Sequence, residues 1–152
     1  MRLVQAGMAF SHARNWRLSR RELPSAFELT SGGATLAGWA YAREEELPDS
    51  AAELETAKDR LVEAIEERDP EFEVDAAETT EVAGAPAIDI RGDQVIAQRR
   101  LRTRSVHIFE GTVEYVIEAL SPPRDYPLVN ERVLEPLLES LELEGEIREG
   151  EE

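Results

Sequence analysis

Alternating apolar and polar positions divide most of the chain into extended segments. Residues 34–41 place Trp39 and Tyr41 on one face of a strand and smaller side chains on the other. Ser31-Gly32-Gly33 is a turn signal directly before this strand, because glycine adopts positive φ without steric cost. The pattern therefore predicts a hairpin between this strand and the segment 26–29.

Further extended segments follow between residues 72 and 120. They cover 72–82, 85–91, 94–109 and 112–120, and three short turns separate them: Ala83-Gly84, Gly92-Asp93 and Glu110-Gly111. The turn at Glu110-Gly111 fixes the register of the last hairpin, because the length of a turn determines which residues pair across it. This register predicts that His107 lies directly opposite Glu114.

Two amphipathic helices are predicted, one before and one after these strands. Ser50 followed by Glu53 matches a capping box, and the apolar stripe behind it predicts a helix over about 50–67. A second apolar stripe predicts a helix over 127–141. Pro136 lies inside this second helix and has no N–H to donate, so we expect a bend there.

Length and composition indicate one globular domain. A chain of 152 residues can bury one hydrophobic core, and we expect residues 1–143 to form it and residues 144–152 to form an acidic flexible tail. The chain contains no cysteine, which excludes a disulfide, a thiolate nucleophile and a cysteine-ligated metal. No segment has the pattern of a signal peptide or a membrane-spanning helix. The location is left open: cytoplasmic as the sequence stands, or the cell envelope or exterior if an N-terminal signal has been lost.

Charge is distributed unevenly along the chain. The formal net charge is -16, which argues against nucleic acid as a partner. Residues 44–81 hold 16 acidic and three basic residues, whereas residues 91–104 hold five arginines and one aspartate. Four of those arginines lie close together on one predicted strand, which we call the arginine strand: Arg99, Arg100, Arg102 and Arg104.

The arginine strand is the first candidate for a binding surface. Arg100, Arg102 and Arg104 project from one face, and a guanidinium binds a carboxylate or phosphate through two parallel hydrogen bonds. We therefore expect the sheet face and this strand to dock a protein partner or an anionic ligand. In the alternative, the same arginines pair with acidic side chains of the protein itself and cover its apolar surface.

Two other candidate sites stay open at this point. Trp39, Tyr41 and Tyr115 are the candidate lining of a pocket for a small amphiphile or lipid between the sheet and a helix. His107 with Glu114 is a weaker candidate for acid–base catalysis in a hydrolase, since no nucleophile motif accompanies the pair. Neither histidine has partners at metal-ligand spacing, so we expect no metal, no cofactor, and a binding protein rather than an enzyme. The oligomeric state is not determined by these patterns.

Three segments of the chain resemble the PsbP-like family. They are the opening strand with Phe10 and Trp16, the turn Val82-Ala83-Gly84-Ala85-Pro86-Ala87 and the closing Pro136-Leu137-Leu138-Glu139-Ser140-Leu141. The resemblance spans roughly residues 7–143. This family includes the extrinsic PsbP protein of photosystem II, a Ran-binding nuclear import factor of yeast, and bacterial envelope proteins of the DcrB and LpqN kinds.

The resemblance implies an α+β fold, namely an α/β/α sandwich on a twisted antiparallel sheet. It also implies a binding or assembly role without a shared chemistry, because members of the family differ in their partners. Many bacterial relatives are exported, often as lipoproteins attached through an N-terminal cysteine, and this chain has no cysteine.

Overall fold

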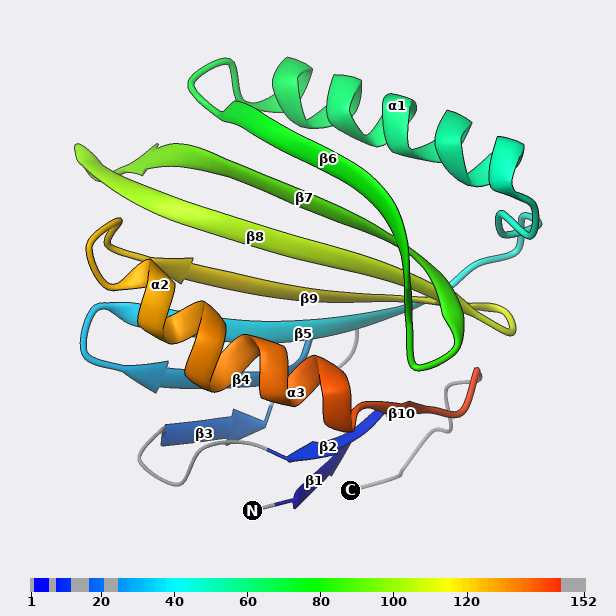
Figure 1. The fold of residues 1–152 in the computed structure, drawn as a ribbon, viewed down its shortest axis with the longest axis horizontal. Helices are drawn as coiled ribbons and strands as arrows, with labels where there is room; N and C mark the ends of the chain where they lie inside the picture. The colour runs from blue at the N-terminus through cyan, green and yellow to red at the C-terminus, as the bar shows by residue number, and fades with distance from the viewer. Residues whose placement is uncertain (1, 6–7, 12–16, 21–24, 146–152) are drawn as a thin grey trace.

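The structure is a computed structural model that describes residues 2–5, 8–11, 17–20 and 25–145 (Figure 1). Trp16, on which part of the family resemblance rests, lies outside the described residues.

A seven-stranded antiparallel sheet forms the centre of the fold (Figure 1). Its strands, in spatial order, are β3 (Arg17–Arg20), β4 (Ser25–Ser31), β5 (Ala34–Ala42), β9 (Val113–Ser121), β8 (Arg99–Glu110), β7 (Ala85–Ile96) and β6 (Glu73–Val82). The strand β6 is therefore one edge of the sheet. A second, three-stranded sheet has the order β1 (Arg2–Gln5), β2 (Met8–Ser11) and β10 (Glu142–Leu143).

Helices cover both faces of the large sheet. The first is α1 (Ala51–Arg68), and it begins at the predicted cap, where the Ser50 hydroxyl oxygen accepts from the Glu53 N–H at 3.2 Å. The second helical layer runs through α2 (Tyr126–Val129), the π-helical turn η1 (Asn130–Leu134) and α3 (Glu135–Ser140). These bounds agree with the two predicted helices to within about one residue at each end.

The bend expected at Pro136 takes the form of the π-helical turn η1. In η1 the Glu135 N–H donates to the carbonyl of Asn130, five residues earlier, instead of four. Pro136 follows directly and cannot donate a backbone hydrogen bond. The wider turn thus takes up the break in the hydrogen-bond ladder without ending the helical layer.

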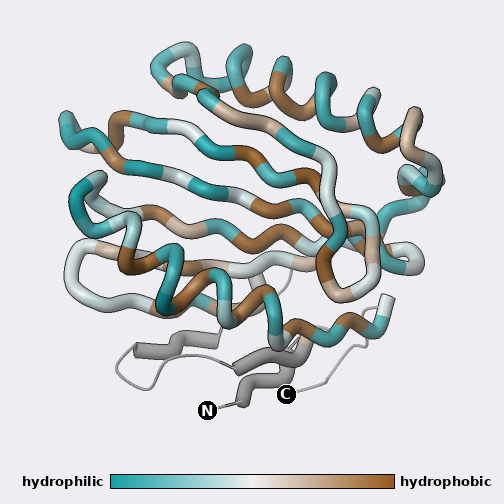
Figure 2. The backbone as a smooth tube through the Cα atoms, viewed as in Figure 1, coloured by the Kyte–Doolittle hydropathy of each residue, from teal (hydrophilic) through white to brown (hydrophobic). Residues whose placement is uncertain are grey.

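Each face of the sheet has its own hydrophobic core. Hydrophobic and hydrophilic residues alternate along the central strands (Figure 2). The larger core lies under α2, η1 and α3 and includes the fully buried side chains of Leu36, Ile108, Tyr115, Ile117, Leu134 and Leu137. The smaller core lies between α1 and strands β7 and β8 and contains Leu54, Ile65, Ile88, Ile90 and Phe109. Side chains of neighbouring strand residues alternate between the two cores, as the pleat requires. The structure therefore confirms the α/β/α sandwich on an antiparallel sheet.

The turns around β8 differ from the sequence prediction. The turn before β8 is made by Ala97 and Gln98, which both adopt positive φ, and not by Gly92-Asp93. Gly92 lies inside β7, where an added Cβ would approach the carbonyl oxygen of Glu73 to 2.3 Å. This glycine is therefore required for the close approach of β6 rather than for a turn, which sequence alone does not distinguish.

The β8–β9 register is also shifted from the predicted one. Glu110 pairs with Val113, so the turn residues are Gly111 and Thr112, with Gly111 at φ 61°. His107 consequently lies opposite Val116, and the prediction that it lies directly opposite Glu114 is wrong. Side chains keep their predicted faces, because the pairing has moved by an even number of positions.

The chain remains packed beyond the predicted start of the tail. The carbonyl of Gly145 accepts from the Thr112 N–H at 3.1 Å, and the Gly145 N–H donates to the Tyr115 hydroxyl at 3.0 Å. Gly145 therefore packs against the β8–β9 turn and Tyr115. Residues 146–152, the remainder of the predicted tail, lie outside the described residues.

Candidate functional site

The sheet face below α1 carries a regular array of side chains from three neighbouring strands. Backbone register places them in three rows across β5, β9 and β8: Ala37, Glu118 and Ser105; Trp39, Val116 and His107; Tyr41, Glu114 and Phe109. Trp39 and Tyr41 were two of the three aromatic residues predicted to line a pocket. They lie on the same sheet face as Glu114 and Glu118 of β9.

A cavity of about 430 Å³ lies between this array and the second half of α1. We call it the α1 cavity. Because α1 packs against β6 and β7, it leaves the β9 and β5 part of the sheet face uncovered. Leu61 and Ile65 of α1 form one wall, and Phe72 follows from the segment that leads to β6. The floor is formed by side chains of the array.

A hydrogen-bonded group stands at one side of the α1 cavity. His107 Nδ1 lies 2.9 Å from Glu114 Oε2, and Arg43 donates to Glu114 Oε1 through Nε at 3.0 Å and Nη2 at 2.8 Å. The Arg43 guanidinium also lies 4.8 Å from the centre of the Tyr41 ring, within cation–π range. Arg43 and Glu114 therefore form an ion pair, and Glu114 orients the His107 ring.

The pKa of Glu114 reflects these neighbours. Burial alone would raise the pKa, but the hydrogen bond with His107 and the charge of Arg43 outweigh burial and hold the pKa below the ordinary value for glutamate. Glu114 is consequently ionised at neutral pH. A carboxylate can only accept hydrogen bonds, so His107 Nδ1 carries the proton between the two groups.

Glu118 is a carboxylate of the α1 cavity without a hydrogen-bond partner in the described part of the chain. Its side chain is half-buried on the cavity floor, and no hydrogen bond to it exists within the described residues. Burial raises its pKa above the ordinary value, while His107 and Arg68 act on it from a distance and lower the pKa by less. In the sequence, Glu118 lies among apolar residues at a position of β9 that faces α1. The sequence analysis did not name it as a candidate site residue.

Tyr115 lies on the opposite face of the sheet from Trp39 and Tyr41. It is fully buried in the larger core, and its hydroxyl accepts from the Gly145 N–H. The pocket expected from three aromatic residues therefore contains only two of them. Phe72, which the sequence reasoning did not include, provides a third aromatic side chain in the α1 cavity.

An open groove lies on the other side of the Arg43–Glu114 pair. It has a volume of about 1080 Å³ and runs between residues 42–48 and the first half of α1. Arg43, Leu61 and Glu114 line both the groove and the α1 cavity. The ion pair and the leucine therefore form the boundary between the two hollows.

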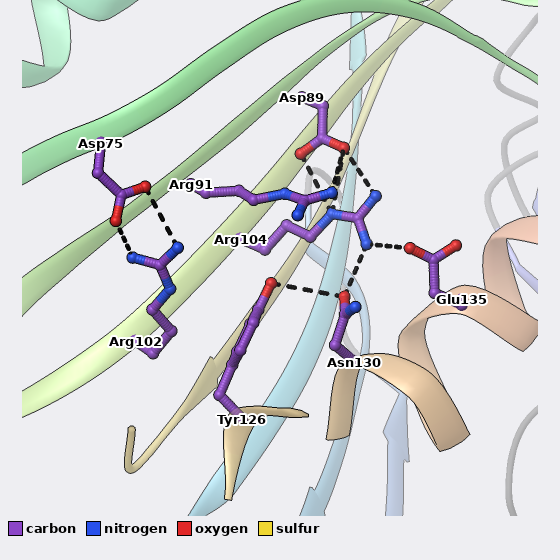
Figure 3. Close-up of polar contacts among 8 residues, drawn as sticks. All are labelled: Asp75, Asp89, Arg91, Arg102, Arg104, Tyr126, Asn130 and Glu135. Atoms are coloured by element: carbon purple, nitrogen blue, oxygen red, sulfur yellow. Dashed lines mark hydrogen bonds and ion pairs between the residues drawn. The ribbon is translucent and has the colours of Figure 1, made fainter. Parts of the chain in front are cut away.

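The arginine strand is β8, and its inner arginine binds groups of the protein itself (Figure 3). Arg104 is buried and donates to Asp89 of β7 through Nη2 at 2.7 Å and Nε at 3.1 Å. Its Nη1 donates to Asn130 at 2.6 Å and to Glu135. Desolvation opposes the charge of Arg104, but these carboxylates outweigh it and raise the pKa of the guanidinium.

The other arginines of β8 become more exposed toward the end of the strand. Arg102 forms an ion pair with Asp75 (Figure 3). It also approaches Asp93 at 3.4 Å and lies 5.4 Å from the centre of the Tyr126 ring. Arg100 donates to Asp93 through Nε at 3.1 Å, and its side chain is 63% exposed. Arg99 is exposed beside the β7–β8 turn.

The pairing of these arginines favours the internal interpretation of the arginine strand. Arg102 and Arg104 are held by carboxylates on strands β6 and β7 and on α3. Charge complementarity within the protein thus explains why a basic strand occurs in so acidic a chain. Only the end of the strand, with Arg99 and Arg100, remains open to solvent.

Within the described ranges, no group of three or more histidine, aspartate or glutamate side chains is arranged to hold a metal ion. None of the helices in the described part of the chain is long and apolar enough to cross a membrane.

The fold and the α1 cavity together define an α+β protein of the α/β/α sandwich type with a hollow between sheet and helix. No protein-family model matches the sequence, and no curated protein matches it.

Solved structures show that this is the PsbP-like fold, as the family resemblance implied. Cyanobacterial PsbP (CyanoP) from Synechocystis sp. PCC 6803 is similar with a TM-score of 0.67 and 8% identity, over 91% of this chain and 87% of that chain. LpqN, involved in cell envelope biogenesis of Mycobacterium tuberculosis, has a TM-score of 0.66 and 12% identity, over 88% and 81% of the two chains. The protein of unknown function PA94 from Pseudomonas aeruginosa has a TM-score of 0.56 and 16% identity, over 80% and 76%. At these low identities the structural similarity shows the fold alone.

Proposed function

We propose that this chain is a non-enzymatic binding module that holds a small amphiphilic molecule in the α1 cavity. The observation that carries the proposal is the lining of the cavity, in which three aromatic and three aliphatic side chains lie beside polar groups that include an unpartnered carboxylate, Glu118. Small-molecule sites combine an apolar lining with a few polar groups that fix orientation. The volume of about 430 Å³ lies within the range of roughly 300–1,000 Å³ that such sites occupy.

The arginine strand is less suited to recognition than the α1 cavity. An external anion that bound Arg102 or Arg104 would have to displace Asp75 or Asp89, and each displaced carboxylate would lose its hydrogen bonds. Arg104 also joins the sheet to the helical layer through its hydrogen bonds to Asn130 and Glu135. A partner that needed these arginines would therefore have to disrupt the fold in order to bind.

The polar groups beside the α1 cavity support binding rather than catalysis. Glu114 is shared between His107 and Arg43, so it orients the imidazole but is already neutralised by a guanidinium. Ser105 lies two residues from His107 on β8, and the two form no hydrogen bond among the contacts of the described residues. A nucleophile activated by a base requires that hydrogen bond.

Tryptophan fluorescence tests the proposal. The chain has two tryptophans, so Trp16→Phe leaves Trp39 as the single reporter inside the α1 cavity. Titration of this variant with short-chain amphiphiles, such as octyl compounds below their micellar concentrations, is expected to change Trp39 emission in a saturable manner. Native mass spectrometry of the same samples gives the stoichiometry, which we expect to be one molecule per chain.

A cavity-filling substitution provides the matched control. Val116→Phe adds volume to the cavity floor between Trp39 and His107, and it should abolish saturable binding. Leu128→Phe makes the same kind of change on α2, where the side chain is 53% exposed, and it should have no effect. The proposal fails if Trp39 emission does not respond in the folded protein, or if Val116→Phe binds as tightly as its parent.

A further inference from the structure

We infer that the α1 cavity selects a ligand whose polar head is an organic ammonium group, with Glu118 as its counter-ion. The inference rests on the proposed function, because it names the chemical class of the molecule that the α1 cavity would hold. It depends on three separate features of the cavity: the hydrogen-bonding character of its open polar groups, its aromatic side chains and the charge of the surrounding protein.

The charged acceptor on the cavity floor is Glu118, and the Ser105 hydroxyl lies on the opposing position of β8. Glu118 has two carboxylate oxygens and no donor within the described residues. His107 uses its Nδ1 proton for Glu114. His107 and Glu118 lie on diagonal positions of neighbouring strands, since Glu118 follows the partner of His107 by two residues. A ligand that satisfies the Glu118 carboxylate must donate hydrogen bonds.

Among the carboxylates of the cavity floor, Glu118 is the one outside any ion pair of the described residues. Arg43 and Glu114 neutralise each other at 2.8 Å. Arg68 is exposed at the end of α1 and forms no ion pair with Glu118, and Asp69 accepts from the Glu71 N–H at 3.1 Å outside the floor. A half-buried carboxylate without a counter-ion is an unfavourable state in the empty protein. An ammonium head would supply both the charge and the donors that Glu118 lacks.

The aromatic side chains favour a cation as well. Trp39, Tyr41 and Phe72 all line the α1 cavity, and the faces of such rings attract cations within about 6 Å. Arg43 already uses the Tyr41 ring in this way, at 4.8 Å. The formal net charge of -16 further raises the local concentration of cations around the protein and repels anions.

Octyl compounds that differ only in the head group test the inference. Octylammonium, octanol and octyl sulfate are titrated against the Trp16→Phe variant, with Trp39 emission as the readout. We expect octylammonium to bind most tightly and octyl sulfate least tightly. Glu118→Gln keeps the shape of the side chain but removes its charge, and it should weaken octylammonium binding roughly 10- to 100-fold while leaving octanol binding nearly unchanged.

Control variants separate a direct contact from the effect of net charge. Glu78→Gln removes the same charge from an exposed position on β6, and it should leave all three affinities unchanged. If octanol and octylammonium bind equally well and Glu118→Gln alters neither, the inference is overturned while the proposed function stands. If octyl sulfate binds best and Arg68→Gln abolishes its binding, the head group is an anion and the inference is equally overturned. If no octyl compound changes Trp39 emission, both the inference and the proposed function fail.

Discussion

Arg104 and Asp89 occupy diagonal positions on adjacent strands of the sheet, and their ion pair is buried. Two nitrogens of the guanidinium bind the carboxylate, with Nη2 at 2.7 Å and Nε at 3.1 Å. The remaining Nη1 donates to Asn130 and Glu135 in the helical layer. One side chain therefore connects β8, β7, η1 and α3.

Arg104→Gln is expected to lower the free energy of unfolding by about 3 kcal/mol, because the buried Asp89 then keeps, among the described residues, only Arg91, at 3.6 Å, as a cationic neighbour. Urea denaturation at neutral pH measures the loss. Arg100→Gln is the matched control on the same strand, and it should change stability little because the Arg100 side chain is 63% exposed. Equal losses for the two variants would contradict the internal role of Arg104.

Leu137→Ala should reduce stability by about 2–5 kcal/mol, since the side chain is fully buried between α3 and the sheet and its removal leaves a cavity. Leu128→Ala removes the same atoms from a position that is 53% exposed, and it should have a small effect. Thermal and urea denaturation of both variants provide the comparison. A small loss for Leu137→Ala would mean that the helical layer is not part of the cooperative core.

Gly111→Ala should destabilise the protein more than Gly84→Ala does. Both glycines have positive φ, 61° and 77° respectively, so both substitutions strain the backbone. A Cβ at Gly111 would additionally approach the carbonyl oxygen of Gly145 to 2.2 Å, whereas one at Gly84 meets no atom within 4 Å. The difference between the two losses, measured by urea denaturation, reports the packing of residue 145 on the β8–β9 turn.

Glu118 and Glu114 should affect the pH dependence of stability with opposite signs. Burial raises the pKa of Glu118, so the folded state favours its protonated form and loses stability as the pH rises above about 4.3, the ordinary value for glutamate. Glu118→Gln should therefore be more stable than the parent at neutral pH, and this gain should disappear as the pH falls below about 4.

Glu114 provides the internal comparison for that measurement. Its pKa is held below the ordinary value, so its ionised form stabilises the fold above about 4.3 and this stabilisation is lost as the pH falls through the lowered pKa. Glu114→Gln should be less stable than the parent at neutral pH, with a difference that shrinks in acid. Urea denaturation at several pH values would contradict the assignment if both variants shifted stability in the same direction.

Local patterns predicted the elements of the fold more reliably than their pairing. The start of α1 was predicted correctly because its signals, Ser50 and the apolar stripe after it, are local in the sequence. Gly92 was misinterpreted because a glycine that permits a turn and one that permits close approach of another strand are identical in sequence. Ala97 and Gln98 form a turn with positive φ without glycine, so no turn residue marked that hairpin.

The candidate site depended on contacts between distant parts of the chain. The faces of Trp39 and Tyr41 followed from strand alternation and were correct. The partners of the arginines were not predictable in this way, because Asp75 and Arg102 are 27 positions apart and meet only through the strand order β6-β7-β8. Phe72 likewise reaches the α1 cavity only through the path of the chain after α1.

The position of β6 at the edge of the large sheet has a consequence for self-association. An edge strand presents unpaired N–H and C=O groups on which another molecule can add a strand. On β6 the exposed side chains include Glu73, Glu78 and Glu81, and their like charges repel a second copy of the same edge. Colloidal stability is therefore coupled to the charge of this edge: replacing Glu73, Glu78 and Glu81 with glutamine should promote edge-to-edge aggregation, which light scattering detects, while the domain stays folded.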